Sequence, residues 1–387
     1  MKRARPAART LALVLALSCG SIACALVAGL EDKQPYDTTN GTGPDGTAPS
    51  GDAAGSEGSV VGDAAKAYGG DVVATMQAKP WGVAVDDAFV YWTNEGDGTV
   101  MRMAKAGGAP VAIARNQLEP RQIVVDPSNV IWSNSNASNR PGDLDSGGYN
   151  NIAHLAKTDI GSAVLPNRIE TTKGTSKLRD LTLSADPADN ALWTSWLDRV
   201  TRYRRTDNGG QADVAKQLTA KDPTAIAVDS VNVYWFLQQP LEIWSAPKDF
   251  ADAGDASVGK IATLPGASEV AHMVADGTAL FMVTTGGAVL KVATPAGGTP
   301  QQLGTGQTFP AGITLDDKDV YFTRTGTNDA AGEGLVVMMS KTGTETKVVA
   351  AGLDKPRAIV VDVGADGSHT LYWTGYGDGT IRRAKVR

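Results

Sequence analysis

The stretch from Gly82 to Thr99 reads Gly-Val-Ala-Val-Asp-Asp-Ala-Phe-Val-Tyr-Trp-Thr-Asn-Glu-Gly-Asp-Gly-Thr, and its pattern recurs along the chain. A short run of small and β-branched residues ends in Asp86, and a large apolar residue, Trp92, follows six positions later. Seven such runs align, 40 to 60 residues apart, ending at Asp86, Asp126, Asp186, Asp229, Asp276, Asp316 and Asp362. Repetition with this period is typical of folds in which every copy is one small structural unit.

Each copy predicts four short strands. The run ending in aspartate is the first, and the alternating stretch Phe89–Thr93, rich in β-branched and aromatic residues, is the second. The dipeptide Asp97-Gly98 tolerates positive φ and predicts a hairpin turn into a third strand, Thr99–Met103. A glycine-rich turn leads to a fourth strand at Val111–Ala114. Four antiparallel strands in seven copies predict an all-β fold, a seven-bladed β-propeller.

Two positions of the repeat have predicted structural roles. The aspartate is expected to cap the turn after the first strand by accepting hydrogen bonds from backbone amides, which we prefer to a catalytic or metal-binding role. The large apolar position is expected to lie in the core, since five of the eight tryptophans share it. Its occupants are Trp92, Trp132, Trp193, Trp235, Met282, Phe322 and Trp373.

The two ends of the repeat region are complementary. The seventh copy stops at Arg387, after its third strand. The segment Asp71–Trp81, before the first copy, aligns with Pro110–Arg121, a fourth strand and its exit loop. We therefore predict that residues 68–387 form one propeller in which the N-terminal strand pairs into the last blade. Such pairing satisfies the backbone groups of an otherwise open edge.

The second strands resemble a known family. Tyr91-Trp-Thr-Asn94 and Tyr372-Trp-Thr-Gly375 resemble the YWTD repeats of receptor propellers, and the Gly82–Asp86 type of strand is similar to NHL-type repeats. The resemblance covers about 320 residues and implies a binding platform, because both families mainly bind diverse ligands. YWTD propellers have six blades, whereas seven are counted here, so no ligand position of the family is carried over.

Composition excludes several chemistries. The only cysteines of the 387 residues are Cys19 and Cys24, which excludes a disulfide scaffold, cysteine-ligated zinc, an iron–sulfur cluster and thiol catalysis in the body of the protein. Three histidines make a histidine-rich metal site improbable. A net charge of −6 gives no electrostatic footprint for nucleic acid. We predict no cofactor, no metal and no nucleic-acid partner, and we expect a monomer.

The N-terminus predicts export. Four basic residues up to Arg9 precede the apolar run Leu11–Leu17, as in a bacterial signal peptide. Ser21-Ile-Ala-Cys24 resembles a lipobox, which would make residues 1–24 a signal peptide and lipidate Cys24, with Cys19 as the alternative. The Gly-, Ser-, Thr- and Asp-rich residues 25–67 predict a disordered tether. An envelope lipoprotein is expected, with the lipid as its one membrane contact; secretion and an uncleaved signal anchor remain the alternatives.

The sequence also predicts a candidate ligand-binding rim. In a propeller, the loops that lead into the first strand of each blade meet around the mouth of the central channel. A rim that carries arginines and a tryptophan could hold an anionic or sugar-like ligand by bidentate hydrogen bonds and stacking. The predicted rim residues are Trp81, Arg121, Arg179 and Arg357. The alternative is a set of solvated charges paired with Glu119, Asp180 and Asp354. A binding module should also expose Trp81, Trp196 and Tyr149.

Three functions remain open. We favour a non-enzymatic, envelope-anchored propeller that binds a protein or a glycan. The second hypothesis is a small-molecule enzyme of the lyase or lactonase kind, for which His272 and Glu269 near the channel are the weak acid–base candidates. The third is a structural envelope component.

Overall fold

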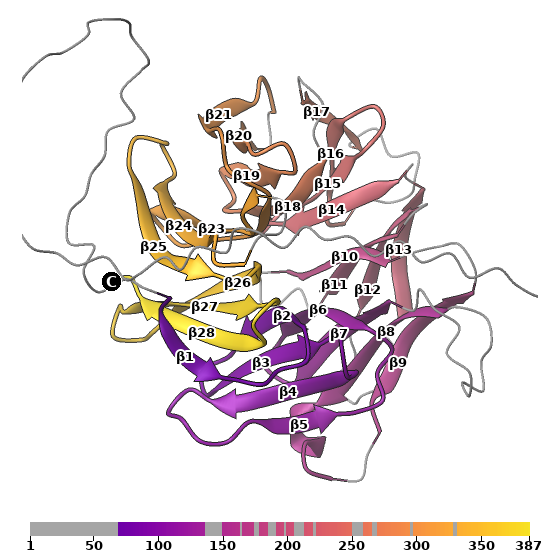
Figure 1. The fold of residues 1–387 in the computed structure, drawn as a ribbon. Coiled ribbons are helices and arrows are strands. Elements are labelled where there is room, and N and C mark those ends of the chain that lie inside the picture. Colours follow the sequence, from indigo (N-terminus) through magenta and orange to yellow (C-terminus); the bar gives the residue numbers. More distant parts are fainter. Residues whose placement is uncertain are drawn as a thin grey trace, which may run out of the picture. The chain divides into compact units, whose positions relative to one another are not determined.

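The computed structural model describes residues 69–135, 149–162, 165–173, 178–184, 191–196, 199–204, 213–219, 222–249, 258–264, 269–294, 297–327 and 331–387. The predicted signal peptide, both cysteines and the predicted tether lie outside these residues. The described part contains seven antiparallel sheets of four strands each, arranged as the blades of a propeller (Figure 1). The predicted all-β, seven-bladed fold is confirmed.

The strands of each blade follow one another from the inside outward. Blade 1 consists of β2 (Pro80–Val85), β3 (Phe89–Asn94), β4 (Thr99–Ala104) and β5 (Val111–Ala114). Blade 2 consists of β6 (Pro120–Val125), β7 (Asn129–Ser135), β8 (Tyr149–Ala156) and β9 (Asn167–Lys173). Blade 3 consists of β10 (Leu178–Leu183), β11 (Ala191–Trp196), β12 (Arg199–Arg204) and β13 (Asp213–Thr219). Blade 4 consists of β14 (Pro223–Val228), β15 (Asn232–Leu237), β16 (Glu242–Pro247) and β17 (Gly259–Thr263). Blade 5 consists of β18 (Val270–Ala275), β19 (Ala279–Thr284), β20 (Val289–Ala293) and β21 (Gln301–Gly304). Blade 6 consists of β22 (Pro310–Leu315), β23 (Asp319–Arg324), β24 (Gly334–Ser340) and β25 (Thr346–Leu353). Blade 7 combines β26 (Pro356–Val363), β27 (His369–Gly375) and β28 (Thr380–Lys385) with β1 (Asp71–Ala74).

Strand exchange closes the ring as predicted. In Figure 1 the indigo strand β1 lies beside the yellow strand β28. Asp71 pairs with Arg383, Val72 with Arg382 and Ala74 with Ile381. After β1, the Gln77 amide donates to the Gly379 carbonyl at 2.9 Å. The first strand of the domain is therefore the fourth strand of the last blade.

One copy of the repeat is aligned incorrectly by sequence. Aligning Asp186 with Asp86 makes Thr182 the equivalent of Gly82. In the structure Thr182 pairs with Trp193, as Val83 pairs with Trp92, so Thr182 is equivalent to Val83 and Leu181 to Gly82. Blade 3 lacks the proline that starts most first strands, and its β-bulge lies between Leu178 and Asp180. This local change shifts the alignment by one residue.

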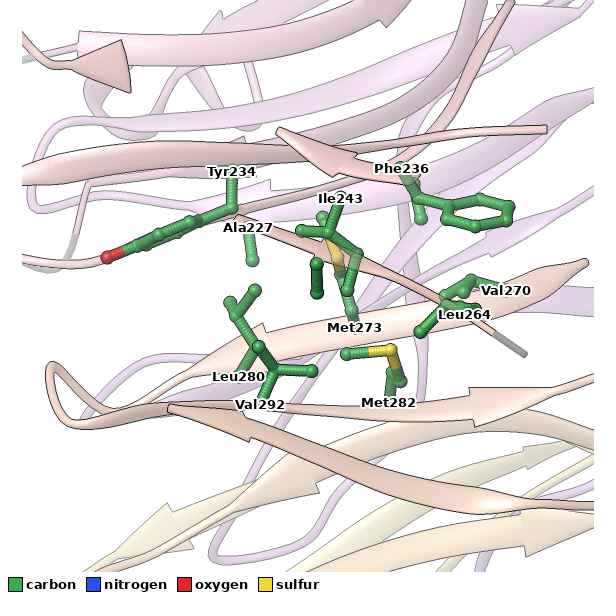
Figure 2. Packing of buried hydrophobic residues seen from close by; sticks show 12 residues of the cluster. Ala227, Tyr234, Phe236, Ile243, Leu264, Val270, Met273, Leu280, Met282 and Val292 are labelled. Carbon is green, nitrogen blue, oxygen red and sulfur yellow. The ribbon is translucent and has the colours of Figure 1, made fainter. Parts of the chain in front are cut away.

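The core lies between neighbouring blades rather than in one central mass. Figure 2 shows one such layer, in which Tyr234 and Phe236 of blade 4 face Met273, Leu280 and Met282 of blade 5. All five side chains are almost fully buried. The predicted core position is confirmed as well, since its seven occupants are between 0 and 3% exposed. Each blade is therefore stabilised mainly by its two neighbours.

Five of the seven repeated aspartates cap turns, as predicted. In five copies the carboxylate accepts amide hydrogen bonds from residues two and three positions later. These copies are Asp86, Asp126, Asp229, Asp276 and Asp316; Asp186 lies outside the described residues. For Asp362 the prediction is wrong, because this residue lies within β26 and pairs with Thr370 of β27, so the first strand continues past it.

A second role of these aspartates was missed at the sequence level. A lysine that follows the third strand of one blade forms an ion pair with the aspartate of the preceding blade. The pairs are Lys105–Asp362 (2.6 Å), Lys157–Asp86 (2.6 Å) and Lys341–Asp276 (2.7 Å). All six side chains are mostly buried, so these contacts link adjacent blades in a partly desolvated setting.

The Lys341–Asp276 link predicts acid sensitivity. Burial disfavours the charged carboxylate, but hydrogen bonds from Lys341, Thr278 and the Ala279 amide outweigh it and lower the pKa of Asp276 to about 2. A depressed pKa stabilises the fold above the unfolded value near 3.8, and this contribution disappears as the pH falls toward 2. We expect Asp276→Asn to lower the free energy of unfolding at pH 7 by about 2 kcal/mol.

Urea unfolding of wild type and Asp276→Asn at several pH values measures this contribution. The difference between the two proteins should shrink steadily between pH 5 and pH 2, in line with protonation of the carboxylate. The exposed Asp87→Asn serves as the matched control and should change stability little at any pH. A difference that does not vary with pH would contradict the role of the ion pair.

No helix in the described part of the chain has both the length and the apolar composition needed to cross a bilayer.

Candidate functional site

The loops that enter the first strands, together with the hairpins joining second and third strands, form one face of the propeller, here called the entry face. Five entry-loop residues adopt left-handed backbone with φ between 45° and 53°, although none is glycine: Lys79, Glu119, Asp222, Phe309 and Lys355. A proline follows each of them and begins the strand. Left-handed backbone costs about 1 kcal/mol for such residues, so other contacts must hold it.

The hairpins provide these contacts. The Glu95 amide donates to the Lys79 carbonyl at 3.1 Å, and the Tyr376 amide donates to the Lys355 carbonyl at the same distance. The same hydrogen bond joins the Thr325 amide to Phe309. The strained residue therefore orients its carbonyl toward the hairpin, and loop and hairpin form one rigid unit.

Two residues after three of these strained positions, Lys79, Glu119 and Lys355, a hydrogen bond from the preceding blade holds the backbone again. A threonine hydroxyl of a second strand donates to a carbonyl of the next blade's first strand. The bonds are Thr93 Oγ1 to Arg121 O (2.5 Å), Thr323 Oγ1 to Arg357 O (2.6 Å) and Thr374 Oγ1 to Trp81 O (3.0 Å). These three carbonyls belong to three of the four predicted rim residues, which are thus held at equivalent positions on blades 7, 1 and 2.

The three side chains form a stack. The guanidinium carbon of Arg357 lies 3.3 Å from the centre of the Trp81 ring, and that of Arg121 lies 4.4 Å from it. Tyr376 meets the Trp81 ring edge-on at 5.8 Å, with an angle of 86° between the ring planes. Trp81 is therefore held between two cations by cation–π attraction and braced at its edge.

Acidic groups complete the stack. Glu95 accepts hydrogen bonds from Tyr376 Oη at 2.7 Å and from Arg121 Nε at 3.0 Å. Arg121 Nη2 lies 2.8 Å from Glu95 and 3.7 Å from Glu119. Burial and the Glu95 carboxylate together raise the pKa of Tyr376 to about 12. The phenol therefore remains a proton donor throughout the physiological range.

Arg179 lies apart from this stack. Its Nη2 forms an ion pair with Asp222 of blade 4 at 3.0 Å, and its carbonyl accepts a hydrogen bond from Gln122 Nε2. No ring contact joins Arg179 to Trp81 in the described residues. The predicted four-residue rim therefore contains a compact cluster of three and a separate arginine.

Some predicted pairings and exposures are wrong. Asp180 is buried and accepts hydrogen bonds from the Leu181 and Ile226 amides, so it does not serve as a rim counterion. Burial raises its pKa. Trp196 is fully buried, because β11 continues through it and Thr194 accepts its indole N–H at 2.9 Å. The side chain of Tyr149 lies outside the described residues.

The two acid–base candidates occupy different surroundings. His272 Nδ1 faces the Ile313 amide of blade 6 at 3.4 Å, in the arrangement of a contact between two first strands. Glu269 borders an open hollow of about 370 Å³ together with Gln238, Gln239, Pro240 and Leu241. The residues lining this hollow do not include His272.

One group of side chains has metal-ligand chemistry. The ligand atoms of Asp316, Asp317 and His369 lie within 4.8 Å of one another. Arg387 donates to Asp317 at 2.9 Å and to Asp316 at 3.3 Å, so a guanidinium balances these carboxylates. Hydrogen bonds, including that from Tyr321, outweigh burial and lower the pKa of Asp316 to about 2. The cluster lies at a turn between first and second strands, away from the entry face.

The sequence places Glu95 on a hairpin at the channel mouth without predicting its pairing, and Tyr376 was missed altogether, although a signal exists. Each stands three residues after the repeated tryptophan of its blade, Trp92 or Trp373, and so occupies one repeat position on a hairpin. Reading that position together with Trp81 and the arginines would have predicted the whole cluster.

Comparisons with known proteins support the fold. No protein-family model matches the chain, and no curated protein matches it. The resemblance to YWTD and NHL-type repeats therefore rests on the quoted residues alone. Many solved structures do match.

Three of these structures illustrate the range. Virginiamycin B lyase from Staphylococcus aureus matches with a TM-score of 0.61 and 15% identity, over 81% of this chain and 97% of that one. A streptogramin B lyase matches with a TM-score of 0.59 and 14% identity, over 82% and 96%. The WD40 β-propeller domain of Doa1 matches with a TM-score of 0.60 and 15% identity, over 82% and 96%. At these identities the likeness establishes the propeller fold alone.

Proposed function

We propose that the chain is a non-enzymatic binding platform that engages its partner through the entry face. The observation that carries this proposal is the Arg357–Trp81–Arg121 stack, which draws on three blades and is held by backbone clamps from the preceding strands. Arginine and aromatic side chains on a rigid scaffold are the residues that most often dominate binding energy in interfaces. Ordering them in advance lowers the entropic cost of association.

The stack favours hydrogen bonding over stacking as its mode of recognition. Guanidinium groups cover the Trp81 ring and Tyr376 meets its edge, so a sugar ring has little access to the indole. The arginines are suited to the carboxylates and carbonyls of a protein partner instead. A lyase- or lactonase-like reaction is less favoured, because the two acid–base candidates do not share a site: His272 Nδ1 accepts from the Ile313 amide, whereas Glu269 lines a hollow that His272 does not border.

The binding proposal has a direct test. The purified full chain is screened against a displayed random-peptide library and an array of neutral and acidic oligosaccharides. For the tightest probe, Arg121→Ala should raise Kd about ten-fold or more. Arg115→Ala, an exposed arginine in the same entry loop, is the matched control and should leave Kd unchanged. If no probe binds, or if Arg121→Ala binds as well as wild type, the platform proposal fails.

We also propose that this platform is an envelope lipoprotein anchored through Cys24. The basic n-region, the apolar run and the Ser21–Cys24 motif support the proposal. Mass spectrometry of the mature N-terminus tests it: a diacylglyceryl mass on Cys24 is expected. The same mass on Cys19, or an unmodified mature chain, would overturn the assignment to Cys24.

A further inference from the structure

Arg324 ends strand β23 on the entry face, at a repeat position that holds asparagine in blades 1 and 2. It pairs with Pro310, as Asn94 pairs with Pro80. In blade 1 the Asn94 amide donates to Gln77 Oε1 at 3.1 Å, and Asn134 makes the same bond in blade 2. Blade 6 thus carries a cation where its relatives carry a neutral amide that is hydrogen-bonded locally.

The charge of Arg324 is not balanced within the described part of the chain. Its Nη2 donates to the Thr308 hydroxyl at 2.9 Å, whereas its buried Nε has no hydrogen-bond partner. No acidic side chain of the described residues pairs with it. By contrast, Arg121 pairs with Glu95 and Arg179 pairs with Asp222. Partial burial without a counterion lowers the pKa of Arg324 and is energetically costly.

An unsatisfied acceptor lies at the same place in the repeat. Gln307 corresponds to Gln77, whose Oε1 accepts from both Trp92 and Asn94. Blade 6 has Phe322 instead of tryptophan, and Gln307 Oε1 is buried without a hydrogen-bond partner. In blade 6 a buried donor and a buried acceptor are therefore both left without hydrogen-bond partners among the described residues.

An apolar contact surface adjoins this cation. Phe309 is 52% exposed and is held in left-handed backbone at φ 45°, with its carbonyl accepting from the Thr325 amide. Thr323, which precedes Arg324, donates to the Arg357 carbonyl of blade 7, whereas the Arg324 side chain lies on the opposite face of β23 and donates to Thr308, in the loop that leads into blade 6. The strained backbone presents an aromatic ring to solvent directly after Thr308, whose hydroxyl accepts from the Arg324 guanidinium; arginine and aromatic side chains are typical of binding hot spots.

We propose that Arg324 and Phe309 form an anchoring site for a protein partner, in which the guanidinium binds a carboxylate side chain and the Phe309 ring packs against an adjacent apolar side chain. This inference rests on the proposed binding function and names the class of partner. A peptide segment supplies both groups at neighbouring positions, whereas an acidic sugar supplies the charge without the apolar neighbour. Bidentate pairing would satisfy the guanidinium, which no acidic side chain of the described residues balances.

The test uses the peptide library panned on the full chain and on its Arg324→Met variant, which keeps the length of the side chain and removes its charge. Peptides selected by wild type should carry Asp or Glu beside a large apolar residue. The best peptide should lose about ten-fold or more in affinity on Arg324→Met and a smaller factor on Phe309→Ala. Arg324→Lys should recover part of the loss, because it restores charge without the planar fork. Arg115→Met is the matched control and should bind like wild type.

Thermal melting separates binding from folding. Arg324→Met removes a cation that has no acidic partner in the described part of the chain, so its Tm should not fall below that of wild type. Selected peptides without acidic residues, or peptides that bind Arg324→Met normally, would overturn the inference. If such peptides depend on Arg121 instead, the platform proposal survives and the anchoring site alone fails. If acidic oligosaccharides bind and no peptide does, the partner class is wrong; if nothing binds, both proposals fail.

Discussion

Deleting Asp71–Gln77 is expected to convert cooperative unfolding into the melting of a partly open, aggregating species. The deletion removes β1, and with it the ladder to β28 and the Gln77 amide bond to Gly379. Ala74, which is buried between blades 7 and 1, is lost as well. The third strand of blade 7 would become an exposed edge, which invites pairing with another chain.

The expected loss exceeds about 4 kcal/mol, at the upper end of what local changes produce. Gln77 adds to it, because its Oε1 accepts from the buried Trp92 indole at 2.8 Å, and removing that acceptor leaves a buried donor unsatisfied. Differential scanning calorimetry with light scattering measures both the transition and the aggregation. Deletion of residues 41–47, of equal length, is the control and should melt like wild type. An unchanged transition in the Asp71–Gln77 deletion would refute ring closure as the source of cooperativity.

The fold was predictable because propeller blades repeat in sequence as well as in space. A period-two pattern in each copy, a large apolar core residue that is tryptophan in five of the seven, and the Asp-Gly hairpins of the first and last copies predicted the strands and the closing pair. The prediction failed where one blade departs from the pattern. Blade 3 lacks the entry proline, its bulge moves, and Trp196 falls inside β11 instead of in an exposed hairpin.

The candidate site was predictable in part. Trp81, Arg121 and Arg357 share one repeat position, so their proximity follows from the ring. Their partners come from hairpins, and whether Glu95 or Glu119 pairs with Arg121 depends on the reach of side chains across blades. That Arg324 has no acidic partner among the described residues is visible only once burial and neighbours are known, because the sequence places acidic residues nearby on most loops.

Gly82→Ala should separate blades 1 and 2 and disturb the stack, although it adds a single methyl group. The Gly82 amide donates to Thr93 Oγ1 at 3.0 Å, and the same hydroxyl donates to the Arg121 carbonyl at 2.5 Å. A Cβ on Gly82 would lie 2.3 Å from that carbonyl oxygen, a distance that real Cβ atoms do not tolerate. Because the obstacle is backbone, either β2 or β6 must move.

We expect Gly82→Ala to lower the free energy of unfolding by about 2 to 4 kcal/mol, in the range of overpacked cores, and to lengthen the Arg121–Trp81 contact. Gly259→Ala is the matched control: it also lies in a strand, and an added Cβ meets nothing within 4 Å. It should change stability by less than about 0.5 kcal/mol. Urea unfolding gives the stability, and the fluorescence of Trp81, read as the difference from a Trp81→Phe reference, reports the stack. If Gly82→Ala were as stable as Gly259→Ala, the threonine clamp would not set the spacing of the blades, and the rigid presentation of the stack would lose its structural basis.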